Sequence, residues 1–388
     1  MPNDYIPYGR QEISDKDIDA VKKVLKSDFL TQGPEVPIFE NSIKNYTQAQ
    51  HAIAFNSATS ALHIACLALG VGEGDTIWTS PNTFVASANC GIYCGSKVDF
   101  VDINYDTLNM CHLKLKEKLE IAKDNNSLPK VVIPVHFGGL SCNMMEIHNL
   151  AKEYGFSIIE DASHAIGGEY LYKKIGSCQY SDITIMSFHP VKIITTGEGG
   201  IALTNSKLLA EEMSTLRTHG VIRDPKKFIN KEHGPWYYEQ IALGFNYRMT
   251  DILAALGTSQ LERLDEFIEK RNLVSQIYDD EFELLPLRPQ ARVKGIKSSF
   301  HLYVVKLDLD YLKFSQREIF QILRDKGIGV NIHYIPVHLQ PFYRNLGFCE
   351  GDFPVSEKYY KEAISLPIFP SISEQEINKV VQSVKSVI

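Results

Sequence analysis

Cysteine and histidine are present in this 388-residue chain, but neither forms a pattern typical of a metal site or a disulfide framework. Seven cysteines are scattered without a CxxC pair, and twelve histidines without an HExxH or comparable cluster. The cysteine count is odd and no export signal is apparent, so we expect reduced thiols. The sequence therefore predicts no metal site.

Long apolar runs and basic stripes are also missing. The amino-terminal stretch MPNDYIPYGRQEIS has no apolar core like that of a signal peptide. No later run approaches the ~18 apolar residues of a membrane span. We therefore expect a cytoplasmic protein with no membrane partner. The net charge is −7 and no basic stripe occurs, which argues against nucleic acid as a partner.

The chain does contain ample material for a large core. Hydrophobic residues make up 44% of the sequence and charged residues 22%, close to the average for soluble globular proteins. A chain of 388 residues fits two domains of unequal size. We expect a large domain over residues 1–255 and a smaller carboxyl-terminal α/β domain over 256–388. The segment 1–14 is a candidate for packing on the smaller domain.

Strand-like and helix-like patterns alternate over the first three-fifths of the chain, which is typical of βαβ units around a mostly parallel sheet. Seven strands are predicted, beginning near His51, Asp75, Lys97, Lys130, Phe156, Asp182 and Gly200. Helices are predicted over 58–69, 83–94, 145–154, 207–219, 250–284, 315–326 and 373–388, the first of them amphipathic. Two late segments, HLYVVKLDL and GVNIHYIP, are strand-like. In such sheets ligands bind outside the carboxyl ends of the strands.

One lysine, Lys192, follows the strand from Asp182 in the stretch SDITIMSFHPVKIITTGEGG. No helical pattern fits between this strand and the next, so we place Lys192 in a loop. A lysine at the end of a buried strand is costly unless it is solvated, paired or used chemically. When desolvated it becomes a nucleophilic amine that can bond to an aldehyde cofactor. Taken alone, the stretch is better explained by a solvated loop lysine, and other sites along the chain change that interpretation.

Two further strand ends carry polar groups. In FNSATSALHIACLALG a helix amino terminus offers N–H groups to a phosphate, and Ser57, Thr59 and Ser60 add hydroxyls. Ser57 acting as an N-cap with no ligand is the alternative. In FSIIEDASHAIGG, Asp161 ends a strand and could hold a protonated ring nitrogen, as an aspartate does in pyridoxal-phosphate enzymes. It could equally cap the following turn, and His164 alone would be an ordinary loop histidine.

The order of these sites resembles that of the fold-type I pyridoxal-phosphate enzymes, and within them the DegT/DnrJ/EryC1/StrS sugar aminotransferase family. The resemblance covers essentially the whole chain, and its most specific pieces are SFHPVKIITTGEGG, DASHAIG, FNSATSAL and GFNYRMTDILAALG. It implies an α/β fold whose large domain has a mostly parallel seven-stranded sheet and binds pyridoxal phosphate. It also implies an aminotransferase that takes an amino group from glutamate and gives it to a nucleotide-linked keto-sugar.

The resemblance implies roles for four residues around the cofactor ring. Lys192 would bond to the cofactor and later move the proton between Cα and the sugar C4. Asp161 would pair with the pyridine nitrogen, His164 would lie by the ring hydroxyl, and Phe84 would stack on the ring face. Some relatives carry a histidine in place of the lysine and act as dehydratases. The lysine at position 192 therefore favours amino transfer.

The resemblance also implies how the phosphate is held. Thr59, Ser60 and Ser187 would contact it within one subunit. Asn246 would reach it from the partner subunit, which implies a homodimer. A turn asparagine and a surface arginine are the alternatives for Asn246 and Arg248.

Among the branches of the family, the chain most resembles transaminases of the pseudaminic acid route. These aminate C4 of a UDP-linked 4-keto-6-deoxy-N-acetylhexosamine of the L-arabino configuration. The segments TQGPEVPIFE, FNSATSAL, SPNTFVASAN, SFHPVKIITTGEGG and VNIHYIPVHLQPFY carry this resemblance. Candidate substrate contacts are Tyr8, Thr31, Gln32, Gly33, Arg248, His333, Tyr334 and His338. For His333, Tyr334 and His338, an ordinary strand end with aromatic packing is the alternative.

Two other functions stay open. The substrate could be another nucleotide-linked 4-keto sugar of the UDP-bacillosamine, GDP-perosamine or dTDP-sugar type. The protein could also be a regulator that binds pyridoxal phosphate without turnover, since a fold does not fix a function. A dinucleotide oxidoreductase is excluded, because GEGG is not GxGxxG and does not open a helix after the first strand.

Overall fold

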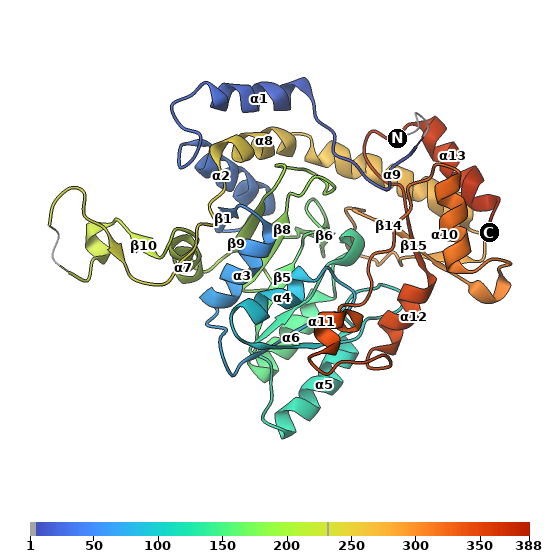
Figure 1. Cartoon of the computed structure of the whole chain (residues 1–388), viewed down its shortest axis with the longest axis horizontal. Coiled ribbons are helices and arrows are strands. Elements are labelled where there is room, and N and C mark those ends of the chain that lie inside the picture. The colour runs from blue at the N-terminus through green and yellow to red at the C-terminus, as the bar shows by residue number, and fades with distance from the viewer. Residues whose placement is uncertain (1–4, 231–232) are drawn as a thin grey trace.

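A seven-stranded sheet forms the centre of the larger part of the molecule in this computed structural model, which describes residues 5–230 and 233–388 (Figure 1). The strand order is β1-β9-β8-β5-β4-β2-β3. Only β9 runs against its neighbours, so six strands point the same way. The predicted α/β fold with a mostly parallel seven-stranded sheet is confirmed. The strands are β1 His51–Phe55, β2 Thr76–Thr79, β3 Lys97–Phe100, β4 Val131–Ile133, β5 Ser157–Asp161, β8 Ile183–Ser187 and β9 Gly200–Thr204.

Helices cover both faces of this sheet, which explains why its strands are almost continuously apolar. In β8, Ile183 and Ile185 pack into the core on one face, and Met186 packs into the core on the other. The first face is covered by α3 Ala58–Ala68, α4 Ala86–Tyr93 and α7 Lys207–Arg217. The second is covered by α2 Glu35–Thr47, α5 His112–Asp124, α6 Met144–Tyr154 and α8 Asp251–Leu261.

A second hydrophobic core surrounds an antiparallel three-stranded sheet towards the carboxyl end. Figure 1 shows α8 continuing into α9, which leads from the large sheet to this smaller part. Its strands are β12 Leu287–Pro289, β14 Tyr303–Leu307 and β15 Ala363–Leu366. Its helices are α9 Leu264–Phe282, α10 Gln316–Asp325 and α13 Glu374–Lys385. The helices α11 Pro341–Arg344 and α12 Pro354–Glu362 pack into other cores through Tyr343 and Tyr359. The domain boundary that we predict between residues 255 and 256 falls inside α8 and stays a prediction.

The amino-terminal segment reaches both parts of the molecule. Ile6 packs into the carboxyl-terminal core, and its N–H donates to the Gly327 carbonyl at 2.9 Å. From there the chain runs to α1 Asp15–Leu25, which lies against α8 (Figure 1). Of the predicted segment 1–14, residues 1–4 lie outside the described residues. Among the described residues, no helix combines the length and apolar character needed to cross a bilayer.

Three predicted elements differ from the structure. GVNIHYIP forms no strand, only an isolated bridge between Asn331 and Ser365. The Asn331 side chain accepts a hydrogen bond from the next backbone N–H at 2.9 Å, and such local bonds compete with a ladder. Helix α3 is not amphipathic, because it is buried from Ser60 to Cys66 between the sheet and two helices. The helix predicted over 250–284 is two helices, α8 and α9.

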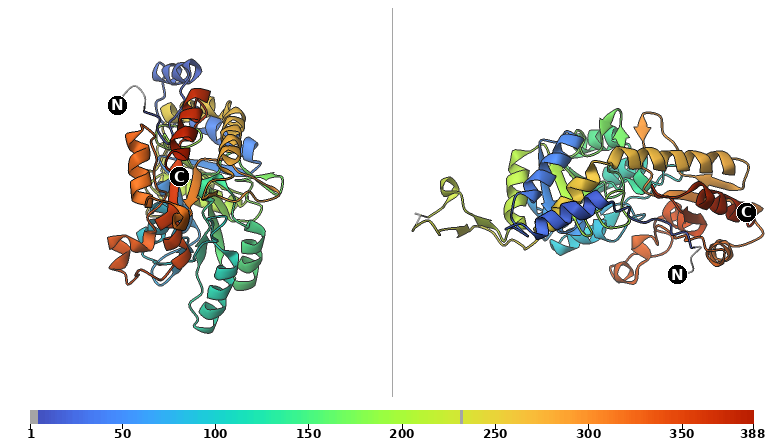
Figure 2. Two further views of the ribbon diagram at one scale, coloured as in Figure 1. Left: turned by 90° about the vertical axis from the view of Figure 1, so that its right-hand side faces the viewer. Right: turned by 90° about the horizontal axis from the view of Figure 1, so that it is seen from above.

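A hairpin projects from the side of the molecule (Figure 1). Its strands β10 Val221–Ile222 and β11 Glu239–Gln240 pair antiparallel. Figure 2 shows the hairpin extending beyond the rest of the chain when the molecule is seen from above. Apolar side chains on and near it are exposed, among them Ile229, Trp236 and Leu243. The remaining small sheet contains β6 Glu169–Tyr170, β7 Lys173–Lys174 and β13 Ile296–Lys297.

Candidate active site

A cavity of about 490 Å³ lies beyond the carboxyl ends of β5 and β8. Parallel strands end at the same edge of a sheet, so residues far apart in the chain meet there. The structure brings nine of the predicted site residues to this one cavity. They are Tyr8, Thr59, Phe84, Asp161, His164, Ser187, Lys192, His333 and Tyr334.

Lys192 is half-buried in the loop that joins β8 to β9. Its backbone N–H donates to the His189 carbonyl at 2.8 Å, which helps to fix the turn. Burial lowers the pKa of Lys192 to about 8, although the charge of Asp161 opposes the shift. The amine therefore loses its proton more readily than an ordinary lysine, which is what a nucleophile near neutral pH requires.

Asp161 is the last residue of β5, and its carboxylate is buried at the cavity. The Ser87 hydroxyl donates to Oδ2 at 2.5 Å, and the Ser163 N–H donates to Oδ1 at 3.0 Å. Two donors on two oxygens fix the orientation of the carboxylate. A buried carboxylate of this kind can hold a protonated ring nitrogen.

The amino terminus of α3 supplies the anion-binding part of the cavity. Ser57 is its N-cap and accepts the Ser60 N–H at 3.1 Å, while Ala58 and Thr59 line the cavity. A Cβ added to Gly200 would lie 2.4 Å from the Ala58 nitrogen, so only glycine lets β9 start this close to the helix. The Ser60 hydroxyl, 3.0 Å from that of Ser57, is buried beneath this turn and does not line the cavity.

Three buried histidines form the opposite wall. The His164 Nδ1 accepts the Gly138 N–H at 3.3 Å, so Nε2 carries the proton and donates to the Tyr334 oxygen at 3.1 Å. The His301 ring lies 4.4 Å from that of His164. Burial, with the charge of nearby groups including Lys192, holds the pKa of both far below the ordinary value. Burial and Lys192 lower the pKa of His333 to about 3. All three rings are therefore neutral near pH 7.

Comparison with known proteins shows the family of this chain. The sequence profile of the DegT/DnrJ/EryC1/StrS aminotransferase family matches residues 11–385. The chain belongs to this family. It is 41% identical over 363 residues to the UDP-4-amino-4,6-dideoxy-N-acetyl-beta-L-altrosamine transaminase of Campylobacter jejuni, covering 93% of this chain and 92% of the relative.

Solved structures of the family agree with this assignment. Helicobacter pylori PseC, an aminotransferase of pseudoaminic acid biosynthesis, superposes with a TM-score of 0.89 at 30% identity and covers 99% of both chains. The Streptococcus pneumoniae protein Spr1654, solved in a PLP-form, superposes with a TM-score of 0.88 at 28% identity, covering 99% of this chain and 98% of that one. This DegT/DnrJ/EryC1/StrS chain is therefore a pyridoxal-phosphate-dependent sugar aminotransferase.

The residues present fit the cofactor of this aminotransferase family. The start of α3 suits the phosphate, because a helix amino terminus favours an anion. Asp161 suits the ring nitrogen and the Lys192 amine suits the aldehyde, and both line the same cavity. Phe84, whose side chain is 59% exposed at the cavity, offers an uncovered ring face for stacking.

Five of the predicted residues lie away from this cavity. Gln32 and Arg248 line a separate pocket of about 690 Å³ beside the projecting hairpin. Asn246 is exposed close by, and its backbone bridges to Thr218. The remaining two, Thr31 and Gly33, are in the loop before α2, where Thr31 bridges to Thr250 and the Gly33 N–H donates to Asp251 Oδ2 at 2.9 Å.

The structure does not bring His338 to either pocket, contrary to the expectation that it contacts the substrate. Its side chain is fully buried, with Nε2 lying 3.0 Å from Glu357 Oε1. Phe353 packs against its ring at 4.8 Å between centroids. A buried hydrogen bond under an aromatic ring is a structural contact, so we leave His338 out of the site.

Sequence reasoning missed several residues that line the cavity. Ser87 lies within SPNTFVASAN, a segment in which only Phe84 has a predicted role. His301 begins the strand-like segment HLYVVKLDL, and Asn331 lies within GVNIHYIP. The signal for Ser87 and His301 was a polar residue beside a strand end or helix start, which is too common to single out without the fold.

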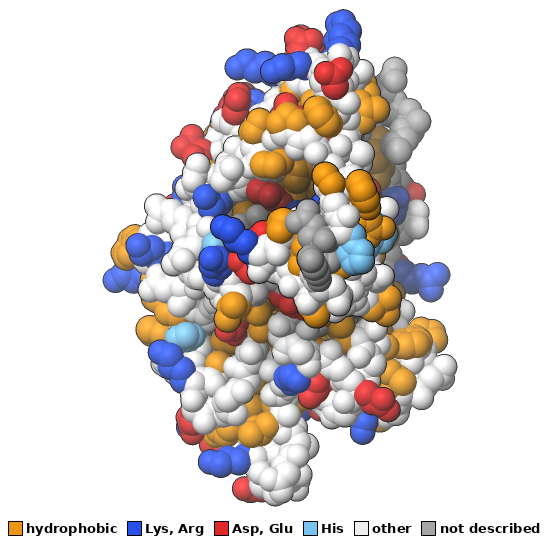
Figure 3. All heavy atoms as spheres, turned by 90° about the vertical axis from the view of Figure 1, so that its left-hand side faces the viewer, with side chains coloured by type: hydrophobic (Ala, Val, Ile, Leu, Met, Phe, Trp, Pro, Cys, Tyr) orange, Lys and Arg blue, Asp and Glu red, His pale blue; other side chains and the backbone are white. Residues whose placement is uncertain are grey.

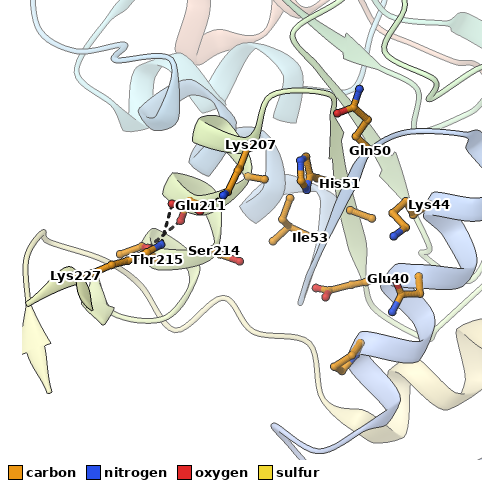
Figure 4. Close-up of a pocket in the computed structure, with 14 residues that line it drawn as sticks. Glu40, Lys44, Gln50, His51, Ile53, Lys207, Glu211, Ser214, Thr215 and Lys227 are labelled. Atoms are coloured by element: carbon orange, nitrogen blue, oxygen red, sulfur yellow. Dashed lines mark hydrogen bonds and ion pairs between the residues drawn. The ribbon is translucent and has the colours of Figure 1, made fainter. Parts of the chain in front are cut away.

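A further hollow of about 420 Å³ lies between α2 and α7, away from the cavity (Figure 4). Figure 4 shows Glu211 bonded to Lys227, which is 2.8 Å away. The other acid in the hollow, Glu40, pairs with Arg217 at 2.6 Å. Because both acids are already paired with cations and nothing points to a ligand, we assign this hollow no part in the reaction.

Proposed function

We propose that this chain transfers the amino group of L-glutamate to C4 of UDP-2-acetamido-2,6-dideoxy-β-L-arabino-hex-4-ulose, a UDP-linked 4-keto-6-deoxy-N-acetylhexosamine, in pseudaminic acid biosynthesis. The observation that carries the reaction class is the meeting of Lys192, Asp161 and the start of α3 in one cavity. The sugar assignment is supported by the 41% identity with the Campylobacter jejuni transaminase and by the overlap with PseC.

The residues that line the cavity have different roles in the proposed amino transfer. Pyridoxal phosphate supplies an electron sink that lets an amino group move between two carbon skeletons. The Lys192 amine is placed to bond to the cofactor aldehyde and, once released, to hold or move a proton in the cavity. Asp161 would keep the ring nitrogen protonated. The start of α3 would hold the phosphate, with hydroxyls from Thr59 and Ser187.

The charge state of the three histidines that line the cavity affects Lys192. Since His164, His301 and His333 stay uncharged near pH 7, they neither attract nor repel the proton that Lys192 carries. The ring nitrogens of His164 and His333 are hydrogen-bonded within the chain, whereas the buried His301 Nδ1 has no partner among the described residues. Burial lowers the pKa of Lys192 to about 8, so the charge of this amine changes near neutral pH.

We propose that the active unit is a homodimer in which each subunit completes the site of the other. The pocket beside the hairpin contains Gln32, Arg248, His219 and Arg223, and no acid lies among its lining residues. Such a pocket suits phosphate groups. Figure 3, which looks at this side of the molecule, shows hydrophobic side chains around the hairpin. Exposed apolar side chains support an interface, and the exposed Asn246 lies beside it.

Mixed dimers test this arrangement. We expect Lys192→Ala and Asn246→Ala proteins to be inactive or strongly impaired alone. When the two are unfolded together, refolded and reconstituted, half of the dimers are mixed and each has one intact site, so activity returns to about a quarter of the wild-type value. A chain with both substitutions, mixed with Lys192→Ala, is the matched control and recovers nothing. A mixture that stays inactive while light scattering shows dimers contradicts the sharing of sites.

The substrate is tested with a panel of 4-keto sugars. Purified holoenzyme and glutamate are offered UDP-, GDP- and dTDP-linked 4-keto sugars, and the aminated product is detected by mass. We expect the UDP-linked L-arabino sugar to give the highest kcat/KM. Preference for a GDP- or dTDP-sugar overturns the substrate but not the reaction. No product with any sugar, together with a cofactor band that glutamate does not bleach, supports a regulator without turnover.

A further inference from the structure

Two hydroxyls in the wall of the cavity form a chain that ends on Asp161. Thr83 Oγ1 lies 2.9 Å from Ser87 Oγ, and Ser87 Oγ lies 2.5 Å from Asp161 Oδ2. All three side chains are buried. Ser87 is on α4 and Thr83 is in the loop before it, whereas Asp161 ends β5, so the chain joins two separate elements.

The direction of these hydrogen bonds follows from the chemistry of the groups. An ionised carboxylate only accepts, so the single Ser87 proton points to Asp161. The Ser87 oxygen then accepts the proton of Thr83. A hydrogen bond donated to a carboxylate is short and stabilises its charged form. A second donor behind the first strengthens it further.

We propose that Ser87, supported by Thr83, is a positioning residue for the reaction: it fixes Asp161 and keeps it charged, so that the proton stays on the ring nitrogen. The proposal rests on the proposed role of Asp161 as the partner of that nitrogen. With Ser87 on Oδ2 and the Ser163 N–H on Oδ1, the carboxylate cannot rotate, and each oxygen keeps a lone pair for the ring.

Removing the Ser87 hydroxyl should change turnover and the pH midpoint of the cofactor band, each in one direction. Without that donor the charged carboxylate is less stable, and the shared proton moves from the ring nitrogen towards Asp161. A ring with less positive charge draws fewer electrons, so turnover slows. The nitrogen of Lys192 bonded to the cofactor becomes more basic, and the pH midpoint of the visible cofactor band rises.

The experiment uses holoenzyme and four variants. We expect Ser87→Ala to raise the pH midpoint of the visible band by about 0.5 to 1 unit. We expect kcat to fall about tenfold with KM for the sugar within twofold. Ser87→Thr keeps the hydroxyl and restores both values, and Thr83→Val gives a smaller shift of the same sign. Ser80→Ala is the matched control, because Ser80 is equally buried but its hydroxyl has no hydrogen-bond partner among the described residues.

The outcomes separate this proposal from the proposed function. If Ser87→Ala binds cofactor with an unshifted band and an unchanged kcat, Ser87 plays no positioning role, while amino transfer stands. If Ser80→Ala shifts the band as much as Ser87→Ala, the effect is one of packing and the proposal is overturned. If the wild-type protein gives no lysine-dependent band at all, the proposed function fails first, whatever the variants do.

Discussion

Two lysines of this molecule share a lowered pKa and differ in what surrounds them. Burial lowers the pKa of Lys192 to about 8, and burial lowers the pKa of Lys306 to about 8 as well. Lys306 lies in β14, where it donates to the Tyr105 carbonyl at 2.7 Å and lies over the Tyr105 ring at 4.3 Å. Lys192 instead faces a cavity that it shares with Asp161.

The comparison teaches that an easily lost proton is not enough for chemistry. Both amines are poised near neutral pH, yet Lys306 is covered by the ring and backbone that it contacts. Lys192 faces a cavity that is also lined by the carboxylate of Asp161 and by the amino terminus of α3. A perturbed pKa points to a site only where a cavity and partner groups accompany it.

Replacing each lysine tests most directly whether Lys192 and Lys306 differ in function. We expect Lys192→Ala to lose at least about a thousandfold in kcat/KM, because no other described residue places a free amine at that position. Lys306→Met, which keeps most of the side-chain volume, stays within about twofold of wild type. The measurement is amino transfer by holoenzyme with circular dichroism to confirm folding. Equal losses in both variants would mean that the cavity confers no special role.

A third buried basic side chain, His136, lies beside an acidic partner, Glu160. Burial alone would lower the pKa of His136, but the neighbouring Cys142 side chain and the hydrogen bond to Glu160 raise it to about 10. The His136 Nε2 lies 2.7 Å from Glu160 Oε2, one residue before Asp161. We expect His136→Gln to lower the free energy of unfolding by about 3–5 kcal/mol, because it leaves a buried carboxylate without its cation.

The sign of the pH dependence checks this assignment. A histidine with a raised pKa stabilises the fold fully below its unfolded value near 6.5 and loses that contribution as pH rises through about 10. The difference between wild type and His136→Gln should therefore shrink from pH 6.5 towards pH 10 in urea unfolding of apo protein. A difference that does not shrink over this range would show that His136 is neutral in the folded state.

The rate at which apo protein takes up the cofactor tests the lowered pKa of Lys192. The neutral amine reacts, and with a pKa of about 8 roughly a tenth of it is neutral at pH 7, against roughly one in 2500 for an ordinary lysine. The rate should rise about fivefold from pH 7 to pH 8 and level off by about pH 9. Formation of the visible band from pH 6.5 to 9.5 measures it, with Nα-acetyl-lysine as control. A rate that keeps rising beyond pH 9 rules out the lowered pKa.

The smallest effect concerns stability at Lys306. We expect Lys306→Met to lower the free energy of unfolding by about 1 kcal/mol, since it removes one hydrogen bond and one cation–π contact. Urea unfolding of the apo protein measures the loss, with Lys114→Met as control because Lys114 pairs only with exposed Glu117. A loss as large as that of His136→Gln would make Lys306 a structural charge of the same kind.

The sequence alone predicts the large sheet and the key side chains on it. Buried parallel strands are continuous apolar runs, so strands such as β5 and β8 stand out, and Asp161 and Lys192 follow from their ends. Contacts that depend on packing could not be predicted. His338 lies within an apparent substrate motif, yet it turns inward to Glu357. Ser87 joins Asp161 only because α4 folds back over the end of β5.

Mapping the lysine that binds the cofactor tests the central claim. Holoenzyme is reduced with borohydride, which makes the bond between lysine and cofactor permanent, and the modified peptide is identified by mass spectrometry after digestion. We expect the cofactor mass on Lys192 alone, and its absence in Lys192→Ala. Finding it on Lys306, or on any other lysine in place of Lys192, would contradict the account.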